Sequence, residues 1–397
     1  MVLAAAAILL ITMGARQCLG LFVAPLHGAT GLGIVTISLS MAIAQLMWGV
    51  AQPVCGAAAD RYGPRPVLVG GALLMAAGCL LTTVASSSWM LALSIGVLFA
   101  FGAGAGSVST LLAGAAARLP PHRRAWATGV INAGGSMGQF LIAPTAQLLI
   151  GSFGWIVAMV SLAGAALATI PLALRFSKPE RQAPVEAQVP AAQVMGLREQ
   201  LSVAAGDRSY WCLHAGFFTC GFHIAFLVTH LPGEANLCGL PASVAAGSLA
   251  LIGLANVAGS LGIGWLASAV RMKWLLFWTY LLRALAIAAY LALPRTSVVF
   301  YGFSIVLGLT WLSTVPPTVG LVGKLFGVRH LATLFGLTLL SHQIGGFLGA
   351  WLGGVALVHV GSFAPMWYAD MALATLAALA NLPVREAALA RPAAAPA

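Results

Sequence analysis

Charged residues are scarce in this sequence. Asp, Glu, Lys and Arg together make up 7% of its 397 residues, and only eight residues are acidic. Soluble domains carry about 25% charged residues, so this scarcity excludes an ordinary soluble fold. Apolar residues fill the chain instead: 60% of it is hydrophobic and its mean hydropathy is +0.98. The composition predicts an all-α integral membrane protein with many spanning helices.

Several motifs are missing as well. The sequence has no Walker motif and no Gly-x-Gly-x-x-Gly after a strand pattern, which excludes ATP as the energy source and a nucleotide-binding fold. Its six cysteines show neither Cys-x-x-Cys nor Cys/His spacing, so we expect no metal and no cofactor. The net charge of +11 does not indicate a nucleic-acid partner, because the basic residues stand in short gaps between apolar runs. No basic segment precedes the first apolar run, which is therefore expected to stay as a helix.

The apolar runs predict twelve transmembrane helices of about 20 residues or more. The expected spans are 3–25, 34–59, 66–86, 89–113, 125–149, 153–175, 209–232, 242–269, 273–293, 297–322, 331–356 and 363–383. Between the sixth and seventh, residues 176–208 contain three prolines and form a polar linker that is not expected to bury itself. The sequence thus predicts an N-terminal six-helix bundle (1–175), a cytoplasmic linker (176–208) and a C-terminal six-helix bundle with a short tail (209–397).

The distribution of Lys and Arg predicts the orientation of these helices. With both termini in the cytoplasm, every basic residue in a loop except Arg295 falls on the cytoplasmic side. We therefore expect a multi-pass protein of a cell inner membrane. The two halves also resemble one another at a shift of 208 residues, where Gly56 and Arg65 align with Gly264 and Lys273. Paired six-helix repeats are typical of one class of transporter.

A charged turn between the second and third spans carries a family resemblance. Gly56, Asp60, Arg61, Gly63 and Arg65 match the pattern G-x-x-x-D-R-x-G-R-R, with Pro64 in place of one basic residue. Together with twelve spans and the repeat, this motif resembles the major facilitator superfamily over essentially the whole chain. The resemblance implies a gating role for the motif, with Asp60 near the start of span 11, where a carboxylate complements the helix dipole.

Three short stretches indicate a branch of that family. Residues 16–22, 48–53 and 222–226 are similar to bacterial carriers grouped with monocarboxylate and oxalate/formate transporters. Proton-coupled drug antiporters carry an Arg early in span 4 and a G-x-x-x-G-P signature in span 5. Span 4 lacks that Arg, and span 5 reads Gly134-Gly135-Ser136-Met137-Gly138-Gln139, so both features are missing here.

Ionisable residues inside the membrane are the sharpest sequence clues to a site. Arg16 and Arg283 lie near the middles of spans 1 and 9, and Asp370 lies in span 12. A charge at the bilayer centre costs ~2.5–3.5 kcal/mol on lenient scales, so each needs a partner or a polar cavity. Arg16 is a candidate substrate ligand or a packed, paired arginine; for Arg283 the packed arginine is favoured. Two positive charges against one negative charge favour an anionic substrate, because arginine grips carboxylates with paired donors.

Polar side chains at helical spacing add candidates for the same site. Gln45 in span 2, Asn132 and Gln139 in span 5 and Asn256 in span 8 lie on helices that border the central cavity in the family. Hydrogen bonds between helices are the alternative role for such residues, at ~0.6 kcal/mol each. His223 in span 7 and His342 in span 11 are candidates for binding substrate or, with Asp370, for carrying a proton.

These patterns predict a secondary transporter that moves a small organic anion, a monocarboxylate or dicarboxylate, by alternating access. Proton coupling and anion exchange both stay open. An efflux pump for drugs or other hydrophobic solutes is the alternative, and a membrane sensor without transport is an alternative of another class. An enzyme is not expected, because no clustered nucleophiles or metal ligands are seen near one interface. The expected partners are the anion, the lipid bilayer and, in the coupled case, protons.

Overall fold

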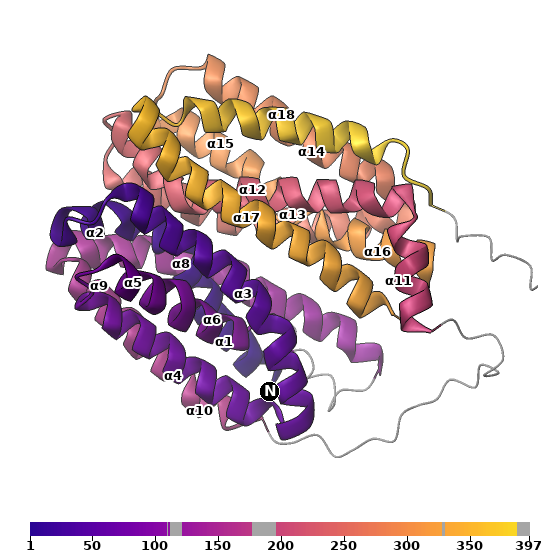
Figure 1. The fold of residues 1–397 in the computed structure, drawn as a ribbon, viewed down its shortest axis with the longest axis horizontal. Helices are drawn as coiled ribbons and strands as arrows, with labels where there is room; N and C mark the ends of the chain where they lie inside the picture. Colours follow the sequence, from indigo (N-terminus) through magenta and orange to yellow (C-terminus); the bar gives the residue numbers. More distant parts are fainter. Residues whose placement is uncertain (109, 112–120, 177–195, 328–329, 387–397) are drawn as a thin grey trace, which may run out of the picture.

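The structure, a computed structural model, describes residues 1–108, 110–111, 121–176, 196–327 and 330–386. Regular structure in these ranges is helical throughout. Figure 1 shows the helices before residue 176 (indigo to magenta) gathered on one side and α12–α18 (pink to yellow) on the other. Long helices dominate because their backbone N–H and C=O groups bond to one another, and lipid offers these groups no other hydrogen-bond partners.

The first half begins with a broken helix. The elements are α1 (Val2–Gln17), η1 (Leu19–Phe22), α2 (Val23–Thr30), α3 (Ile34–Tyr62), α4 (Pro64–Thr83), α5 (Ser88–Leu91), η2 (Ala92–Phe99), α6 (Ala100–Ala105), α8 (Pro121–Phe153), α9 (Trp155–Leu167) and α10 (Ile170–Ala173). The chain bends by 41° between α1 and the following Leu19–Thr30 segment. Residues Ala92–Phe99 form a π-helical stretch between α5 and α6, a feature that often marks functional regions.

The second half also has one interrupted span. Its elements are α11 (Leu197–Ala205), α12 (Arg208–Leu237), α13 (Ala242–Ala269), α14 (Met272–Ala292), α15 (Ser297–Thr310), α16 (Val315–Phe326), α17 (Leu331–Val360) and α18 (Ala364–Asn381). Prolines inside a helix usually kink it, and span 10 contains Pro316 and Pro317. The helix in fact breaks just before them, at residues 311–314, and both prolines lie in the first turn of α16, where a missing N–H costs least.

The segment expected to be a polar linker needs a correction at its end. Residues 197–205 form the helix α11, in which Gln200 and Ala204 are buried. The Gln200 side chain donates a hydrogen bond from Nε2 to the backbone oxygen of Phe326, at the end of α16, over 2.5 Å. The expectation that this segment cannot bury itself is therefore wrong for residues 197–205.

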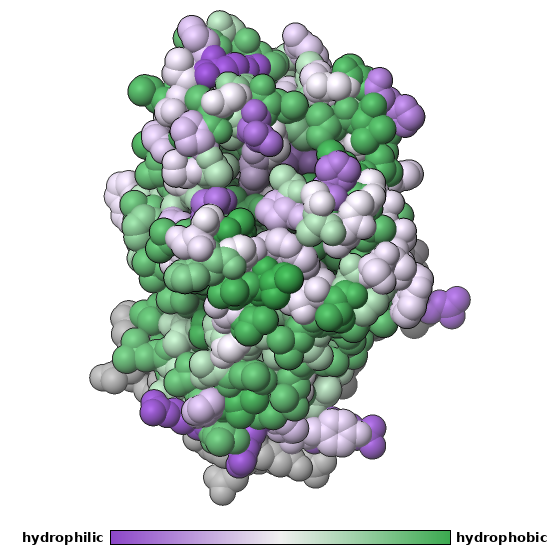
Figure 2. All heavy atoms as spheres, turned by 90° about the vertical axis from the view of Figure 1, so that its left-hand side faces the viewer, coloured by the Kyte–Doolittle hydropathy of each residue, from purple (hydrophilic) through white to green (hydrophobic). Residues whose placement is uncertain are grey.

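Most of the described helices are long and apolar enough to cross a bilayer. Nine pass a test of length and hydropathy, and the bent pair Val2–Gln17 and Leu19–Thr30 makes ten if counted as one span. Two further helices, α8 with 33 residues and α18 with 18, are not among them. Together they follow the expected order of spans. Large apolar side chains are exposed along the surface, and Figure 2 shows broad hydrophobic areas on the face it presents. Such surface suits lipid contact, as expected of a multi-pass integral membrane protein.

The two halves meet along two seams between long helices and at a third contact, where η1 packs on α12. One seam joins α3 to α17: a Cβ added to Gly354 would lie 2.2 Å from the Ser38 hydroxyl, and one added to Gly49 would lie 2.4 Å from Gln343. The other joins α8 to α13, where a Cβ added to Gly253 would lie 2.8 Å from the Ser136 carbonyl oxygen. Without side chains, these glycines let the helix backbones approach closely.

The seams are closed toward one end of the molecule only. We call the end that holds Met1, Arg65, Arg208 and Arg271 the basic end, and the end that holds Thr30, Leu240 and Gly361 the opposite end. On the opposite side of the middle, Gly20 touches Val228 and Gly354 touches Ser38. Toward the basic end a Cβ on Gly56 of α3, Gly336 of α17, Gly129 of α8 or Gly262 of α13 would meet nothing within 4 Å. Among these glycines, contacts between the halves are found toward the opposite end and none toward the basic end.

Candidate functional site

Arg16 lies at the bend in the first span. It is 7% exposed and stands one residue before the end of α1, where a positive charge complements the helix dipole. Its Nη2 donates a hydrogen bond to Oε1 of Gln45 on α3, and its Cζ lies 4.2 Å from the ring centroid of Trp48, one turn further along that helix. The structure therefore brings together two of the candidates, Arg16 and Gln45, and adds a cation–π contact.

A small cavity adjoins Arg16 between the two halves. The space that a water-sized sphere can reach in it is about 10 Å³, room for about one water molecule. Its walls include residues from both halves of the chain: Arg16, Leu19, Met41, Ala44, Gln45, Phe99, Ala100, Val228 and Thr229. Arginine has five N–H donors, and the bond to Gln45 uses one of them. If the cavity widened as its walls moved apart, a polar ligand could enter and would meet the Arg16 guanidinium, which has little contact with water.

Buried polar atoms without a protein partner gather along the same seam. They include Nε1 of Trp48 and both amide atoms of Gln343, which is 1% exposed. Gln343 packs on Gly49, the residue after Trp48, and so presents an amide from α17 close to the Arg16 cluster. The sequence analysis named Gln45 as a candidate but did not single out Gln343. Its burial depends on the packing of α3 against α17, which spacing alone does not reveal.

The polar residues of span 5 divide between two environments. Gln139 is 2% exposed, its Nε2 has no partner, and its Cβ lies 2.9 Å from the position of a Cβ on Gly253. Asn132, two turns earlier on α8, is exposed. Gln139 is therefore part of the α8–α13 seam, whereas Asn132 lies where the halves have separated. Both stay candidates for contact with substrate, in different parts of its path.

Asn256 is occupied by protein contacts. Its Nδ2 donates to Oγ of Ser136 in the other half over 2.9 Å, and its Oδ1 accepts from Oγ of Ser260 and from the backbone N–H of Leu312, each over 3.1 Å. It is 2% exposed. In this state the side chain joins three helices, which is the interhelical role that the sequence left as the alternative to binding substrate.

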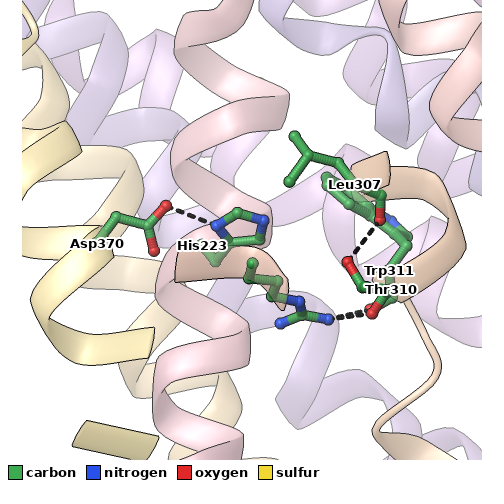
Figure 3. A network of polar contacts seen from close by, with 6 residues as sticks. His223, Leu307, Thr310, Trp311 and Asp370 are labelled. Atoms are coloured by element: carbon green, nitrogen blue, oxygen red, sulfur yellow. Dashed lines mark hydrogen bonds and ion pairs between the residues drawn. The ribbon is translucent and has the colours of Figure 1, made fainter. Parts of the chain in front are cut away.

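His223 and Asp370 form a buried pair in the second half. The two side chains are 1% and 0% exposed, and Nδ1 of His223 lies 2.5 Å from Oδ2 of Asp370 (Figure 3). The other two polar atoms, His223 Nε2 and Asp370 Oδ1, have no protein partner. His342, the other candidate for carrying a proton, lies on α17, with its ring 6.0 Å from that of Phe217 on α12.

Arg283 is fully buried and is held by backbone oxygens. Its Nη2 donates to the carbonyl oxygens of Thr310 and, over 2.8 Å, of Trp311, at the end of α15 (Figure 3 shows both acceptor residues). A guanidinium is well suited to this position, because the last carbonyls of a helix lack partners and carry the negative end of its dipole. The structure thus gives Arg283 the packed role that was favoured for it, and Asp370 pairs with His223.

The charged motif spans the junction of α3 and α4: Gly56, Asp60 and Arg61 lie in the last turns of α3, Arg65 lies in the first turn of α4, and only Gly63 stands between the two helices. Gly63 adopts φ +91°, a conformation that side chains rarely allow, and its N–H donates to the carbonyl oxygen of Ala59 over 2.8 Å. Arg61 and Arg65 are exposed, and Arg61 Cζ lies 5.2 Å from the Tyr62 ring centroid. Gly56 faces open space. The side chain of Asp60 lies outside the described residues, so its gating contact stays a prediction.

Comparison with known proteins gives the family. The model for the "Major Facilitator Superfamily" matches residues 5–350. The chain belongs to this superfamily. Such proteins transport solutes, so the chain is a membrane transporter and not an enzyme.

Individual relatives and solved structures agree with this assignment. The chain is 26% identical to "Monocarboxylate transporter 13" of Rattus norvegicus over 318 residues, covering 79% of this chain and 71% of that one. It is 23% identical to "Uncharacterized MFS-type transporter YcxA" of Bacillus subtilis, covering 86% of this chain and 83% of that one. Among solved structures, a D-xylose-proton symporter shares the fold with a TM-score of 0.76 at 15% identity, over 97% of both chains.

Proposed function

We propose that this superfamily member carries a small organic anion, a monocarboxylate or dicarboxylate, across a cell inner membrane. The observation that carries the proposal is Arg16, a nearly buried guanidinium beside a cavity whose walls come from both halves. No acidic side chain forms a salt bridge with Arg16 among the described residues. A carboxylate of the substrate is the natural counter-ion for such a group, because it accepts paired hydrogen bonds. The similarity to a monocarboxylate transporter supports the same substrate class.

Transport would proceed by alternating access of the site to the two membrane faces. The halves touch at the opposite end and separate toward the basic end, so the state described is open to one face. Lys and Arg cluster at the basic end, which we assign to the cytoplasm together with both termini. In this proposal residues 1–175 and 209–397 form the two bundles that rock about the Arg16 site.

Proton coupling would use the buried pair of His223 and Asp370. The two side chains face each other over 2.5 Å, and each has one further polar atom without a protein partner that a water molecule could reach. Arg16 lies in the first half and this pair in the second, so anion and proton would occupy separate positions. Protonation of the pair would compensate the negative charge that enters with the substrate.

Two measurements on purified protein test the proposal. Thermal shift with lactate, pyruvate, oxalate, formate, aromatic acids and cationic drugs identifies the ligand class. Counterflow of the stabilising compound in proteoliposomes, with and without a pH gradient, then tests transport and coupling. We expect stabilisation and counterflow with one or more anions. Stabilisation by cationic or neutral hydrophobic compounds alone would instead support an efflux pump, and a ligand that binds without counterflow would support a sensor.

A further inference from the structure

The break in span 10 is held from two sides by polar side chains. Arg283 on α14 donates to the carbonyl oxygens of Thr310 and Trp311, and Asn256 on α13 accepts the N–H of Leu312 over 3.1 Å. Thr310 is the last residue of α15, Trp311 is its C-cap, and Leu312 lies in the break that follows. Where the helix is interrupted, these two carbonyl oxygens and this N–H have no helical hydrogen-bond partners. The side chains of Arg283 and Asn256 supply partners instead and so fix the geometry of the break.

One side of the break touches the His223–Asp370 pair. The ring of Trp311 lies 6.1 Å from the His223 imidazole, edge to face at 61°, and is 1% exposed (Figure 3). The carbonyl oxygen of the same tryptophan accepts from Arg283. A change in the charge of the His223 imidazole therefore acts on the Trp311 ring and on the Arg283 guanidinium, and both of these groups hold the break in place.

The other side of the break touches the first half of the protein. Asn256, which accepts from Leu312, donates through its Nδ2 to Ser136 on α8. The backbones are in close contact here as well, since a Cβ on Gly253, one turn before Asn256, would lie 2.8 Å from the Ser136 carbonyl oxygen. This seam must slide or open when the halves rock.

We propose that Asn256 is a coupling residue, which transmits the protonation state of His223 and Asp370, through Thr310, Trp311 and Leu312 at the break in span 10, to the contact between the two halves. This inference rests on the proposed function only in taking that pair as the proton site. It assigns Asn256 a positioning role instead of contact with substrate. Protonation places an additional positive charge near Arg283, loosens the hold of Arg283 on the break, and shifts Leu312 and the Asn256–Ser136 bond together.

Other titratable groups lie around the pair and are part of its electrostatics. From the helices packed there come Cys220 and His230 on α12, Tyr280, Arg283 and Tyr290 on α14, and His342 on α17. The aromatic ring of Tyr280 lies 5.5 Å from Cζ of Arg283. Tyr290 donates to Glu234 at the opposite end. Asn256 and Ser136 do not titrate, so their removal tests transmission without changing these charges.

The test measures conformation as a function of pH without any substrate. Spin labels at Tyr62→Cys and Val270→Cys, exposed positions at the basic end of the two halves, report how far the halves are separated. The background carries Cys212→Ser and Cys238→Ser, because these two cysteines are only partly buried. In the otherwise unchanged protein we expect the ratio of open to closed populations to change by at least about fivefold between about pH 5 and 8.

Asn256→Leu and, independently, Ser136→Ala should flatten this pH response to less than about twofold while both states stay populated. The matched control is Ser260→Ala, which removes only the bond within α13 and should keep the full response. A full response in Ser136→Ala, or no response in the unchanged protein, would overturn the inference. Failure of the proposed function is seen separately, as an absence of anion counterflow in protein whose conformation still follows pH.

Discussion

Asp370 and His223 are 147 positions apart in the chain, yet Oδ2 of one and Nδ1 of the other lie 2.5 Å apart in the interior of the second half. Helix α18 supplies the carboxylate and α12 the imidazole. Removal of one partner from a buried charged pair costs about 3–5 kcal/mol, because the other is left unpaired. Replacement of either side chain should therefore lower the stability of the fold, and the two groups lie close enough to hold a proton between them.

Asp370→Asn should abolish proton-driven accumulation of the anion while anion exchange continues. The asparagine keeps the shape of the side chain but cannot take up a proton, so protons can no longer be carried at this position and the pH gradient cannot drive transport. Accumulation in proteoliposomes under an imposed pH gradient, compared with counterflow at equal pH, separates the two activities. Glu234→Gln is the matched control, because it also neutralises a buried acid that is hydrogen-bonded to a neighbour, here Tyr290. Unchanged accumulation in Asp370→Asn would exclude this carboxylate from coupling.

Arg16→Lys should weaken binding of the cognate anion by about 10- to 100-fold. Lysine keeps the charge but presents a single ammonium group, which cannot grip a carboxylate with two parallel N–H donors, and it loses the planar stacking on Trp48. Isothermal titration of the purified variant measures the change in Kd. The control is Arg175→Lys, an exposed arginine at the end of the sixth span. An equal Kd in Arg16→Lys and the unchanged protein would remove Arg16 from the anion site.

Gly20→Ala should prevent closure at the opposite end. A Cβ at this position would lie 2.0 Å from the carbonyl oxygen of Val228 and 2.9 Å from that of Thr229, so α12 cannot remain packed on η1. The seam must open there, and Thr229, now 3% exposed, becomes accessible. A cysteine at position 229 should therefore react several times faster with a membrane-impermeant thiol reagent. Gly28→Ala, with nothing within 4 Å, is the control. Equal labelling in the two variants would contradict this account of the closed end.

Sequence patterns predicted the order of helices and the charged turn because both follow from local chemistry. Apolar runs become helices in lipid, and Gly63 stands where the backbone needs a positive φ. The pairing of candidate residues could not be predicted in this way. Sequence patterns named His223 and Asp370 as candidates for carrying a proton but not as a contacting pair, and they did not predict that Arg283 would bind carbonyl oxygens or that Gln343 would be buried. Each of these contacts depends on how distant helices cross. The break in span 10 lies just before Pro316 and Pro317, where side chains of α13 and α14 bind its backbone, and these contacts too depend on distant helices.

Arg283→Met should lower the stability of the second half without unfolding it. The variant removes the guanidinium donor from the buried carbonyl oxygens of Thr310 and Trp311, which leaves Trp311 with only the weak Cys220 thiol donor, at about 1–3 kcal/mol for each unsatisfied group. Methionine fills similar space and removes a charge whose burial is itself costly, which offsets part of that loss. Asn256 still holds the N–H of Leu312, so the break persists with one support instead of two. We therefore expect a lower Tm in detergent, with Arg175→Met as the exposed control. A Tm equal to that of the control would mean that other groups hold the end of α15 and that Arg283 is retained for its charge.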